Sequence, residues 1–225
     1  MEDNKMVGKT ISIEPVVTSE DVLIQVSESI EVTKKIRVTV PAHYRAIAYI
    51  DQKALFRIDS CVDLNLVKEY GKELLGKKIQ IAFIAQRTLA QSPWGFGNIQ
   101  VNNERLKEAY RIGANGKFSI EITDCVKLIQ SFPNSSFITI EQVRGKIIST
   151  IKSVGMPILG EYFSKTSTSV FEMSSLIGDF REKFMDALQN EKIFANMGIR
   201  VSTLTVDGFH ANEDDLKLIR DRINA

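Results

Sequence analysis

Residues 92–124 read SPWGFGNIQVNNERLKEAYRIGANGKFSIEITD, and they decide how the rest of the chain can fold. Phe118, Ile120 and Ile122 recur at every second position, which is the spacing of side chains on one face of a β-strand. The only tryptophan of the chain, Trp94, follows a proline and precedes two glycines. Glycine adopts backbone angles that other residues avoid. We therefore expect Trp94 to be buried at a corner between two strands, where the glycines shape the turn.

The tetrapeptide Gly-Ala-Asn-Gly at 113–116 interrupts this alternation. An Asn-Gly pair accepts positive φ angles at low cost and is a strong hairpin signal. Taken by itself, the tetrapeptide therefore predicts a turn between the strand patterns on either side of it.

Strand patterns also precede this region. The pentapeptide IRVTV at 36–40 alternates aliphatic and polar residues, so its aliphatic side chains share one face. Two further apolar stretches, 44–50 and 54–58, flank a predicted hairpin turn at 51–53. Pro41 cannot donate a hydrogen bond to a sheet and therefore marks a strand boundary.

Helical periodicity begins near residue 139. Apolar residues three or four positions apart predict a helix over 139–162 with one buried stripe, formed by Ile140, Val143, Ile147, Ile151, Val154 and Ile158. Thr139 and Gln142 have the spacing of a capping box at its start. Pro157 is expected to kink or end the helix. The segment 164–175 is polar and reads as a linker.

Shorter helices are predicted where capping residues stand next to apolar stripes. One covers 65–76, and another follows Asp124 over 125–131. The last begins after Asn212, with acidic residues in its first turn and basic residues later, as the helix dipole prefers. A further helix ends by Gly198 and aligns Ile177, Phe180, Phe184 and Leu188.

Strands come first, helices follow, and a late strand at 199–206 returns to them. This order is typical of an α+β fold with a largely antiparallel sheet and packed amphipathic helices, and not of repeated βαβ units. We predict an N-terminal extension over 1–35 that is partly disordered or forms a strand. An α+β domain is predicted over 36–210, and the start of a longer C-terminal helix over 211–225.

The composition excludes several classes of protein. The 29 basic and 28 acidic residues give a net charge of +1, whereas general nucleic-acid binding usually needs a basic excess. The N-terminus lacks the apolar core of a secretory signal. No apolar run approaches the roughly 20 residues that span a bilayer. We therefore expect a cytoplasmic protein whose membrane contact is peripheral.

Few residues suggest catalysis, and we predict no catalytic, cofactor-binding or metal-binding residues. His43 and His210 are the only histidines; a hydrolase with a dispersed active site would use one of them as its base, but a structural role is the simpler interpretation. Cys61 and Cys125 lack partners at metal spacing and are expected to be buried thiols, with a disulfide as the alternative. Consecutive acidic residues at 213–215 point in different directions on a helix, so they fit a helix start better than a metal site.

A nucleic-acid-binding module is a further alternative. Trp94 follows a segment that contains basic residues, and an exposed tryptophan ring can stack on a nucleic-acid base. The near-neutral net charge argues against this alternative, and we predict no nucleic-acid partner.

In their order along the chain, these segments resemble the stomatin–prohibitin–flotillin superfamily (SPFH, or band seven). VPAHYRAIAYIDQKALFRI at 40–58 is similar to its opening pair of strands. Residues 92–124 resemble the branch described as virion-core-protein-like, whose members carry Trp-Gly after a strand and then a segment of the form R-x-x-G-x-[YF]-S-[IY]-x-I. The helix at 141–158 and the segment 184–223 are similar to the units that follow. The matching positions of that form are Arg111 or a near neighbour, Gly116, Phe118, Ser119, Ile120 and Ile122.

The resemblance covers about residues 36–225 and implies a non-catalytic scaffold or adaptor. Members of the family form compact α+β domains that assemble into membrane-associated oligomers. We therefore expect a homo-oligomer with protein partners, peripheral association with the inner face of a membrane, and no cofactor. The resemblance also implies a single strand through Gly116, so that 113–116 would be a glycine-containing strand, with or without a bulge, and not a hairpin tip.

Overall fold

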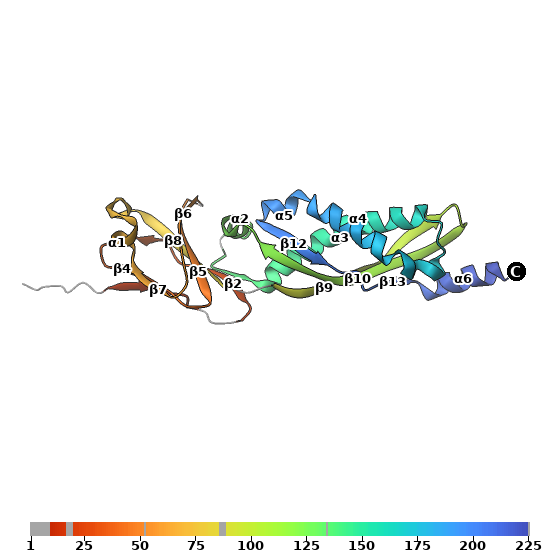
Figure 1. The fold of residues 1–225 in the computed structure, drawn as a ribbon, viewed down its shortest axis with the longest axis horizontal. Coiled ribbons are helices and arrows are strands. Elements are labelled where there is room, and N and C mark those ends of the chain that lie inside the picture. The colour runs from red at the N-terminus through yellow and green to blue at the C-terminus, as the bar shows by residue number, and fades with distance from the viewer. Residues whose placement is uncertain (1–9, 17–19, 52, 86–88, 134, 225) are drawn as a thin grey trace, which may run out of the picture. The chain divides into compact units, whose positions relative to one another are not determined.

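Strands β9 (Leu89–Asn103) and β10 (Glu108–Ile122) run antiparallel and contain most of residues 92–124 (Figure 1). The structure is a computed structural model that describes residues 10–16, 20–51, 53–85, 89–133 and 135–224. Each of the two strands has 15 residues, whereas about five or six are usual. The chain reverses between them at 104–107, so the turn does not lie at Trp94.

The predicted corner at Trp94 is therefore wrong, because this residue lies within β9. In the described part of the chain β9 pairs only with β10, and a strand at the edge of a sheet tolerates Pro93. Ile112 pairs with Ile99 but Ala114 pairs with Phe96, so β9 carries an extra residue at this point. The neighbouring Asn98 has a φ of 60°. The turn-forming residues thus make a β-bulge that the strand passes through.

The strand prediction for 113–116 is confirmed, and the hairpin prediction from local chemistry is wrong. Both glycines of this tetrapeptide lie in β10 and are needed because other groups approach them closely. A Cβ on Gly116 would lie 1.9 Å from the carbonyl oxygen of Thr205, and a Cβ on Gly113 would lie 2.2 Å from Nε2 of His210. A glycine in a strand often marks such a close approach.

Contacts within the chain divide it into two compact units, whereas one domain was predicted over 36–210. Unit 1 contains residues 1–87 and 124–142, and unit 2 contains 88–123 and 143–225. Both units mix strands with helices, and all strand pairs but one are antiparallel among the described residues. The predicted α+β class with a largely antiparallel sheet is therefore confirmed.

The described residues of unit 1 form two sheets. The smaller has the order β1 (Ile11–Ile13), β4 (Ile36–Val40), β7 (Val62–Asn65), and its β1–β4 pair is parallel. The larger has the order β11 (Phe137–Thr139), β2 (Val22–Val26), β8 (Lys78–Ala85), β5 (Tyr44–Ile50), β6 (Lys53–Ile58), with β3 (Ile30–Glu31) also paired to β8. Three of these strands lie in the predicted extension over 1–35, of which 1–9 are outside the described residues.

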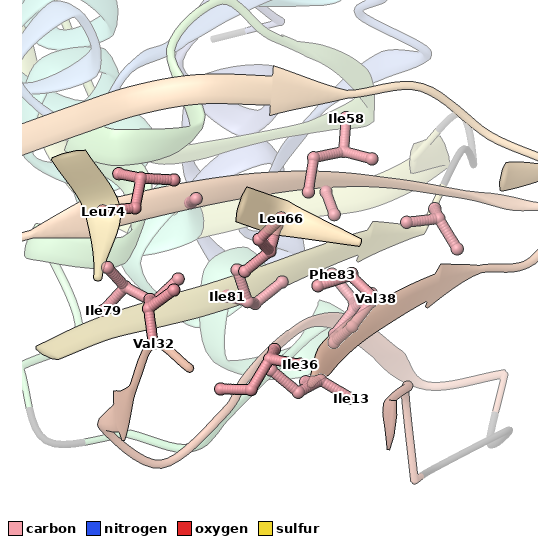
Figure 2. Packing of buried hydrophobic residues seen from close by; sticks show 13 residues of the cluster. Ile13, Val32, Ile36, Val38, Ile58, Leu66, Leu74, Ile79, Ile81 and Phe83 are labelled. Carbon is pink, nitrogen blue, oxygen red and sulfur yellow. The ribbon is translucent and has the colours of Figure 1, made fainter. Parts of the chain in front are cut away.

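Aliphatic side chains from both sheets form the core of unit 1. Figure 2 shows Ile36 and Val38 of β4 near Ile81 and Phe83 of β8, and all four are almost completely buried. The alternation predicted for 36–40 is confirmed, since its aliphatic residues are buried and its polar residues only partly so. The strands on either side of the predicted hairpin turn at 51–53 are also confirmed, while Gln52 lies outside the described residues.

The two short helices expected in unit 1 are present in modified form. Helix α1 (Leu66–Tyr70) is separated from the 3-10 helix η1 (Lys72–Leu74) by Gly71, so the single helix predicted over 65–76 is broken. Gly71 has a φ of 103°, which an α-helix cannot contain. Helix α2 (Cys125–Gln130) begins as predicted, with Asp124 accepting hydrogen bonds from the backbone N–H groups of Val126 and Lys127.

Unit 2 has β10 at the centre of its sheet (Figure 1). Strand β9 lies on one side of β10, and β12 (Ile199–Leu204) and β13 (Gly208–Ala211) pair with the other side. Alternate residues of β10 are buried, including Tyr110, Ile112, Phe118 and Ile120. The helical elements are α3 (Ile140–Lys165), η2 (Val170–Leu176), α4 (Ile177–Gln189), α5 (Lys192–Asn196) and α6 (Glu213–Ile223), of which α3 begins in unit 1.

Helix α3 has the predicted capping box but continues beyond the predicted end. The backbone N–H of Thr139 donates to Oε1 of Gln142, and the N–H of Gln142 donates back to Oγ1 of Thr139. Pro157 lies inside the helix, which runs on to Lys165 and takes up the start of the predicted linker at 164–175. The buried stripe also changes after Ile151. Val154 and Ile158 are only partly buried, and the fully buried positions are Gly155, Leu159 and Phe163.

Replacing Gly155 with alanine should destabilise unit 2, although alanine favours a helix. A Cβ at this position would lie 2.6 Å from Cζ of Phe184 and 2.7 Å from Cε1 of Phe96. We expect a net loss of about 1–3 kcal/mol in the free energy of unfolding, since overpacking outweighs the propensity gain. Urea unfolding followed by Trp94 fluorescence measures this loss.

Gly145 in the same helix provides the matched control. It is exposed, and no atom lies within 4 Å of the position its Cβ would take. Gly145→Ala should therefore stabilise unit 2 by about 1 kcal/mol. Equal stabilisation by both substitutions would show that α3 is not packed tightly at Gly155.

Candidate functional site

A cavity of about 250 Å³ lies in unit 1, between the larger sheet and the loop that follows α2. Its floor comes from β2, β5 and β8, because Tyr49 of β5 pairs with Gln80 of β8. Its other wall comes from α2 and the residues after it. The lining residues are Val26, Ser27, Glu28, Tyr49, Gln80, Val126, Ile129, Gln130, Phe132, Pro133, Ser135 and Ser136.

Tyr49 is the most buried polar residue of this lining, with a relative exposure of 5%. Its hydroxyl forms no hydrogen bond with any residue in the described part of the chain. Burial raises the pKa of Tyr49 to about 12. The phenol therefore remains protonated at neutral pH and can both donate and accept a hydrogen bond.

Gln80 lies next to Tyr49 and has a fixed orientation. Its Nε2 donates to the backbone carbonyl of Ser27 over 3.3 Å, which leaves Oε1 as an acceptor. Oγ of Ser27 is already engaged, since it accepts from the N–H of Ile81 and donates to the carbonyl of Glu28. The carboxylate of Glu28 is exposed. Hydrogen-bond acceptors therefore predominate at this end of the cavity.

The two histidines considered for catalysis lie in different units. His43 is exposed between β4 and β5 in unit 1, and His210 is exposed on β13 in unit 2. No carboxylate, hydroxyl or thiol among the described residues is hydrogen-bonded to either imidazole. The ring of His210 instead lies against Gly113, which has no side chain.

The two cysteines are free thiols in the structure, and only one of them is sheltered from solvent. The prediction that both are buried is wrong, because Cys61 is exposed in the turn between β6 and β7. Cys125 lies in the first turn of α2, where burial is the main cause that raises the pKa of its thiol. A raised pKa reduces the fraction of reactive thiolate.

The acidic residues at 213–215 serve the start of α6, as predicted. Oδ1 of Asn212 accepts from the N–H of Asp215, and the Asp215 carboxylate binds the guanidinium of Arg111 through both oxygens at 2.9 Å. The same carboxylate accepts from the backbone N–H of Arg111. These hydrogen bonds lower the pKa of Asp215 and tie α6 to β10. No group of three or more metal-ligating side chains occurs within the described ranges.

Asp215→Asn should loosen α6, because the amide loses the charge that binds Arg111. We expect amide hydrogen exchange over 216–223 to become several-fold faster, with little change elsewhere. The pKa of Asp215 is lowered, so its contribution is present at neutral pH and is lost as the pH falls through that lowered value. Asp214→Asn, an exposed neighbour in the same turn, is the control. Equal effects of the two substitutions would contradict a specific role for Asp215.

Trp94 is not available for stacking on a nucleic-acid base. Its relative exposure is 4%, and its ring contacts Phe96 and Phe184 at centroid distances of 5.3 and 5.4 Å. Its Nε1 donates to the carbonyl of Thr205 over 3.1 Å. The burial predicted for Trp94 is confirmed, and the structure removes this ring as a binding residue. Arg87, one of the basic residues before it, lies outside the described residues.

The cavity residues Tyr49, Gln80 and Glu28 did not stand out in the sequence. Tyr49 and Gln80 belong to ordinary strand patterns, and only the pairing of β5 with β8 brings them together. No short motif connects them with the loop after α2. The strand patterns therefore predicted the strands, but they did not predict that these residues line one cavity.

Within the ranges that the structure describes, no helix has both the length and the apolar character needed to cross a membrane.

Comparison with known proteins does not assign a family. No model of a known protein family matches the chain, and no curated protein matches it.

Proposed function

We propose that the chain is a non-catalytic scaffold or adaptor whose copies associate and hold partner proteins, at a membrane surface. The observation that supports association is the apolar surface that α6 leaves open. Leu218 and Ile223 are 65% and 66% exposed, although the first turn of the same helix is fixed to the sheet. A helix that is held to the sheet and still exposes two large aliphatic side chains is suited to pack against another copy.

The anchoring of α6 involves several contacts beyond the Arg111–Asp215 ion pair. Ile219 is 4% exposed and therefore buried against the rest of unit 2. Nη1 of Arg222 donates to the carbonyl of Lys107, and the guanidinium of Arg220 lies 5.5 Å from the ring centroid of Phe171. Leu216, Ile219 and Ile223 follow steps of three and four, which is the spacing of a helix–helix seam. Ile219 of this row is buried within unit 2, whereas Ile223 is open to a partner helix.

The membrane part of the proposal rests on the resemblance to the SPFH superfamily. That resemblance implies assemblies that are attached to a membrane from one side. In this proposal the chain contacts lipid peripherally from the cytoplasmic side, and its role is to organise other proteins there.

Light scattering coupled to size-exclusion chromatography tests the association. We expect the mass of the full chain to rise with concentration and to return to that of a monomer in the Leu218→Lys, Ile223→Lys double variant. Both positions are exposed, so stability should change by no more than about 0.5 kcal/mol. Leu55→Lys, at an exposed apolar position of unit 1, is the matched control.

Flotation with vesicles that contain phosphatidylserine tests the membrane part. A chain that is monomeric at every concentration would overturn the scaffold proposal. A chain that associates but does not float with vesicles would overturn only its membrane part.

A further inference from the structure

We infer that the cavity beside Tyr49 binds a primary alkylammonium group, such as the end of a lysine side chain. This inference does not depend on self-association, because the cavity lies wholly within unit 1 and α6 belongs to unit 2.

The charge of the lining favours a cation. Glu28 is the one ionised side chain among the described lining residues, and no lysine or arginine is among them. Nε2 of Gln80 donates to Ser27, and Oε1 of the same amide accepts no hydrogen bond from the described part of the chain. An ammonium group carries three donors and no acceptor. The available acceptors therefore match its hydrogen-bonding capacity.

Tyr49 supplies the buried contact. Its hydroxyl accepts and donates no hydrogen bond within the described part of the chain, so it is available to a ligand in the cavity. Because its pKa is raised to about 12, the phenol is neutral at the pH at which an alkylammonium group is charged. Its oxygen can then accept a hydrogen bond from the ammonium while its proton is donated elsewhere.

The remaining lining suits an aliphatic stem. Val126, Ile129 and Pro133 are apolar residues of the lining, and the aromatic residue Phe132 belongs to it as well. Aromatic faces attract cations, and apolar walls cover methylene groups. The volume of about 250 Å³ is below the range of roughly 300–1,000 Å³ typical of sites for drug-sized ligands. A single extended side chain is therefore a better match than a whole nucleotide or sugar.

Nuclear magnetic resonance titrations with three four-carbon probes test the inference. The probes are n-butylammonium, n-butanol and butyrate, which have similar stems and differ in charge. We expect saturable shifts at the amides of the cavity lining with n-butylammonium, with a dissociation constant of about 1 mM. Amides of unit 2 serve as an internal control. Shifts of equal size with n-butanol, or none with n-butylammonium, would overturn the inference.

Two variants assign the effect to the cavity. Tyr49→Phe should weaken n-butylammonium binding about tenfold, and Glu28→Gln about fivefold. The first removes an unpartnered hydroxyl, so the fold should be retained, which circular dichroism checks. Glu31→Gln neutralises an exposed carboxylate that does not line the cavity and should have no effect. Unchanged affinity in both cavity variants would overturn the inference.

A second comparison identifies the source of the ammonium group. Nα-acetyl-lysine methylamide and its norleucine counterpart differ only in the terminal amine. Tighter binding of the lysine compound than of n-butylammonium supports a lysine of a protein partner, and the reverse supports a free amine. Equal binding of the lysine and norleucine compounds would overturn the inference.

Discussion

Unit 2 of the Gly116→Ala variant should be unfolded or strongly destabilised. The added Cβ would lie 1.9 Å from the carbonyl oxygen of Thr205 and 2.8 Å from its carbonyl carbon. These are backbone atoms, and the N–H of Thr205 is held by a hydrogen bond to the carbonyl of Lys117 at 2.8 Å. They cannot move aside without breaking the sheet. We expect a loss of at least about 3 kcal/mol in the free energy of unfolding.

Urea unfolding followed by tryptophan fluorescence measures this loss in unit 2 alone. Trp94 is the only tryptophan and belongs to unit 2. Gly208→Ala is the control, because Gly208 is also in a strand of this sheet and no atom lies within 4 Å of its added Cβ. The control should change stability by no more than about 0.5 kcal/mol. If Gly116→Ala unfolded at the same urea concentration as the control, the close approach of Thr205 would be refuted.

Trp94→Ala should lower the free energy of unfolding of unit 2 by about 3–5 kcal/mol. This is the range for removing a large buried aromatic side chain. The substitution removes the ring contacts with Phe96 and Phe184 and leaves the carbonyl oxygen of Thr205 without the indole donor. Trp94→Phe retains much of the ring packing and loses the hydrogen bond together with the smaller ring of the indole. Its cost should therefore be closer to 1–2 kcal/mol, a rough value for one unsatisfied buried acceptor.

Far-ultraviolet circular dichroism follows these variants, since they lack the fluorescent residue. Phe171→Ala is the control, because this aromatic side chain of unit 2 is 43% exposed. Phe171→Ala should lower the free energy of unfolding by about 1 kcal/mol or less, which is well below the loss expected for Trp94→Ala. If Trp94→Ala unfolded at the same midpoint as the wild-type chain, the contact between the indole of β9 and the carbonyl of Thr205 would not stabilise unit 2.

The strand patterns and helix caps could be predicted because each depends on residues only a few positions apart. The alternation at 36–40 matched the burial of β4. Asp124, Thr139 with Gln142, and Asn212 cap the helices that follow them, as their sequence positions indicate. In each case the donor and acceptor are separated by two or three residues, so the local sequence contains both partners.

The continuation of α3 through Pro157 shows how tertiary packing overrides a local rule. A proline inside a helix costs about 3 kcal/mol or more. The turns that follow it bury Leu159 and Phe163 completely. Each contributes roughly 1.5–3 kcal/mol when removed from water. Their combined burial is large enough to offset the proline, which the helical pattern by itself did not reveal.

The division into two units also depended on contacts between distant residues. Strand β11 pairs with β2 although more than a hundred residues separate them, and this pairing places 124–142 in unit 1. The candidate site has the same origin, because it joins β2, β5 and β8 to the loop after α2. Nothing within a short window of sequence records such a pairing.

For residues 92–124, the sequence alone determined the alternation of β10 and the burial of Trp94, because both follow from apolar character and spacing. The tertiary structure decided that this segment forms two long strands without a corner at Trp94. The glycines at 95, 97, 113 and 116 are compatible with turns as well as with strands. At 113 and 116 glycine is required because His210 and Thr205 occupy the space that a side chain would need, and the sequence does not show these contacts.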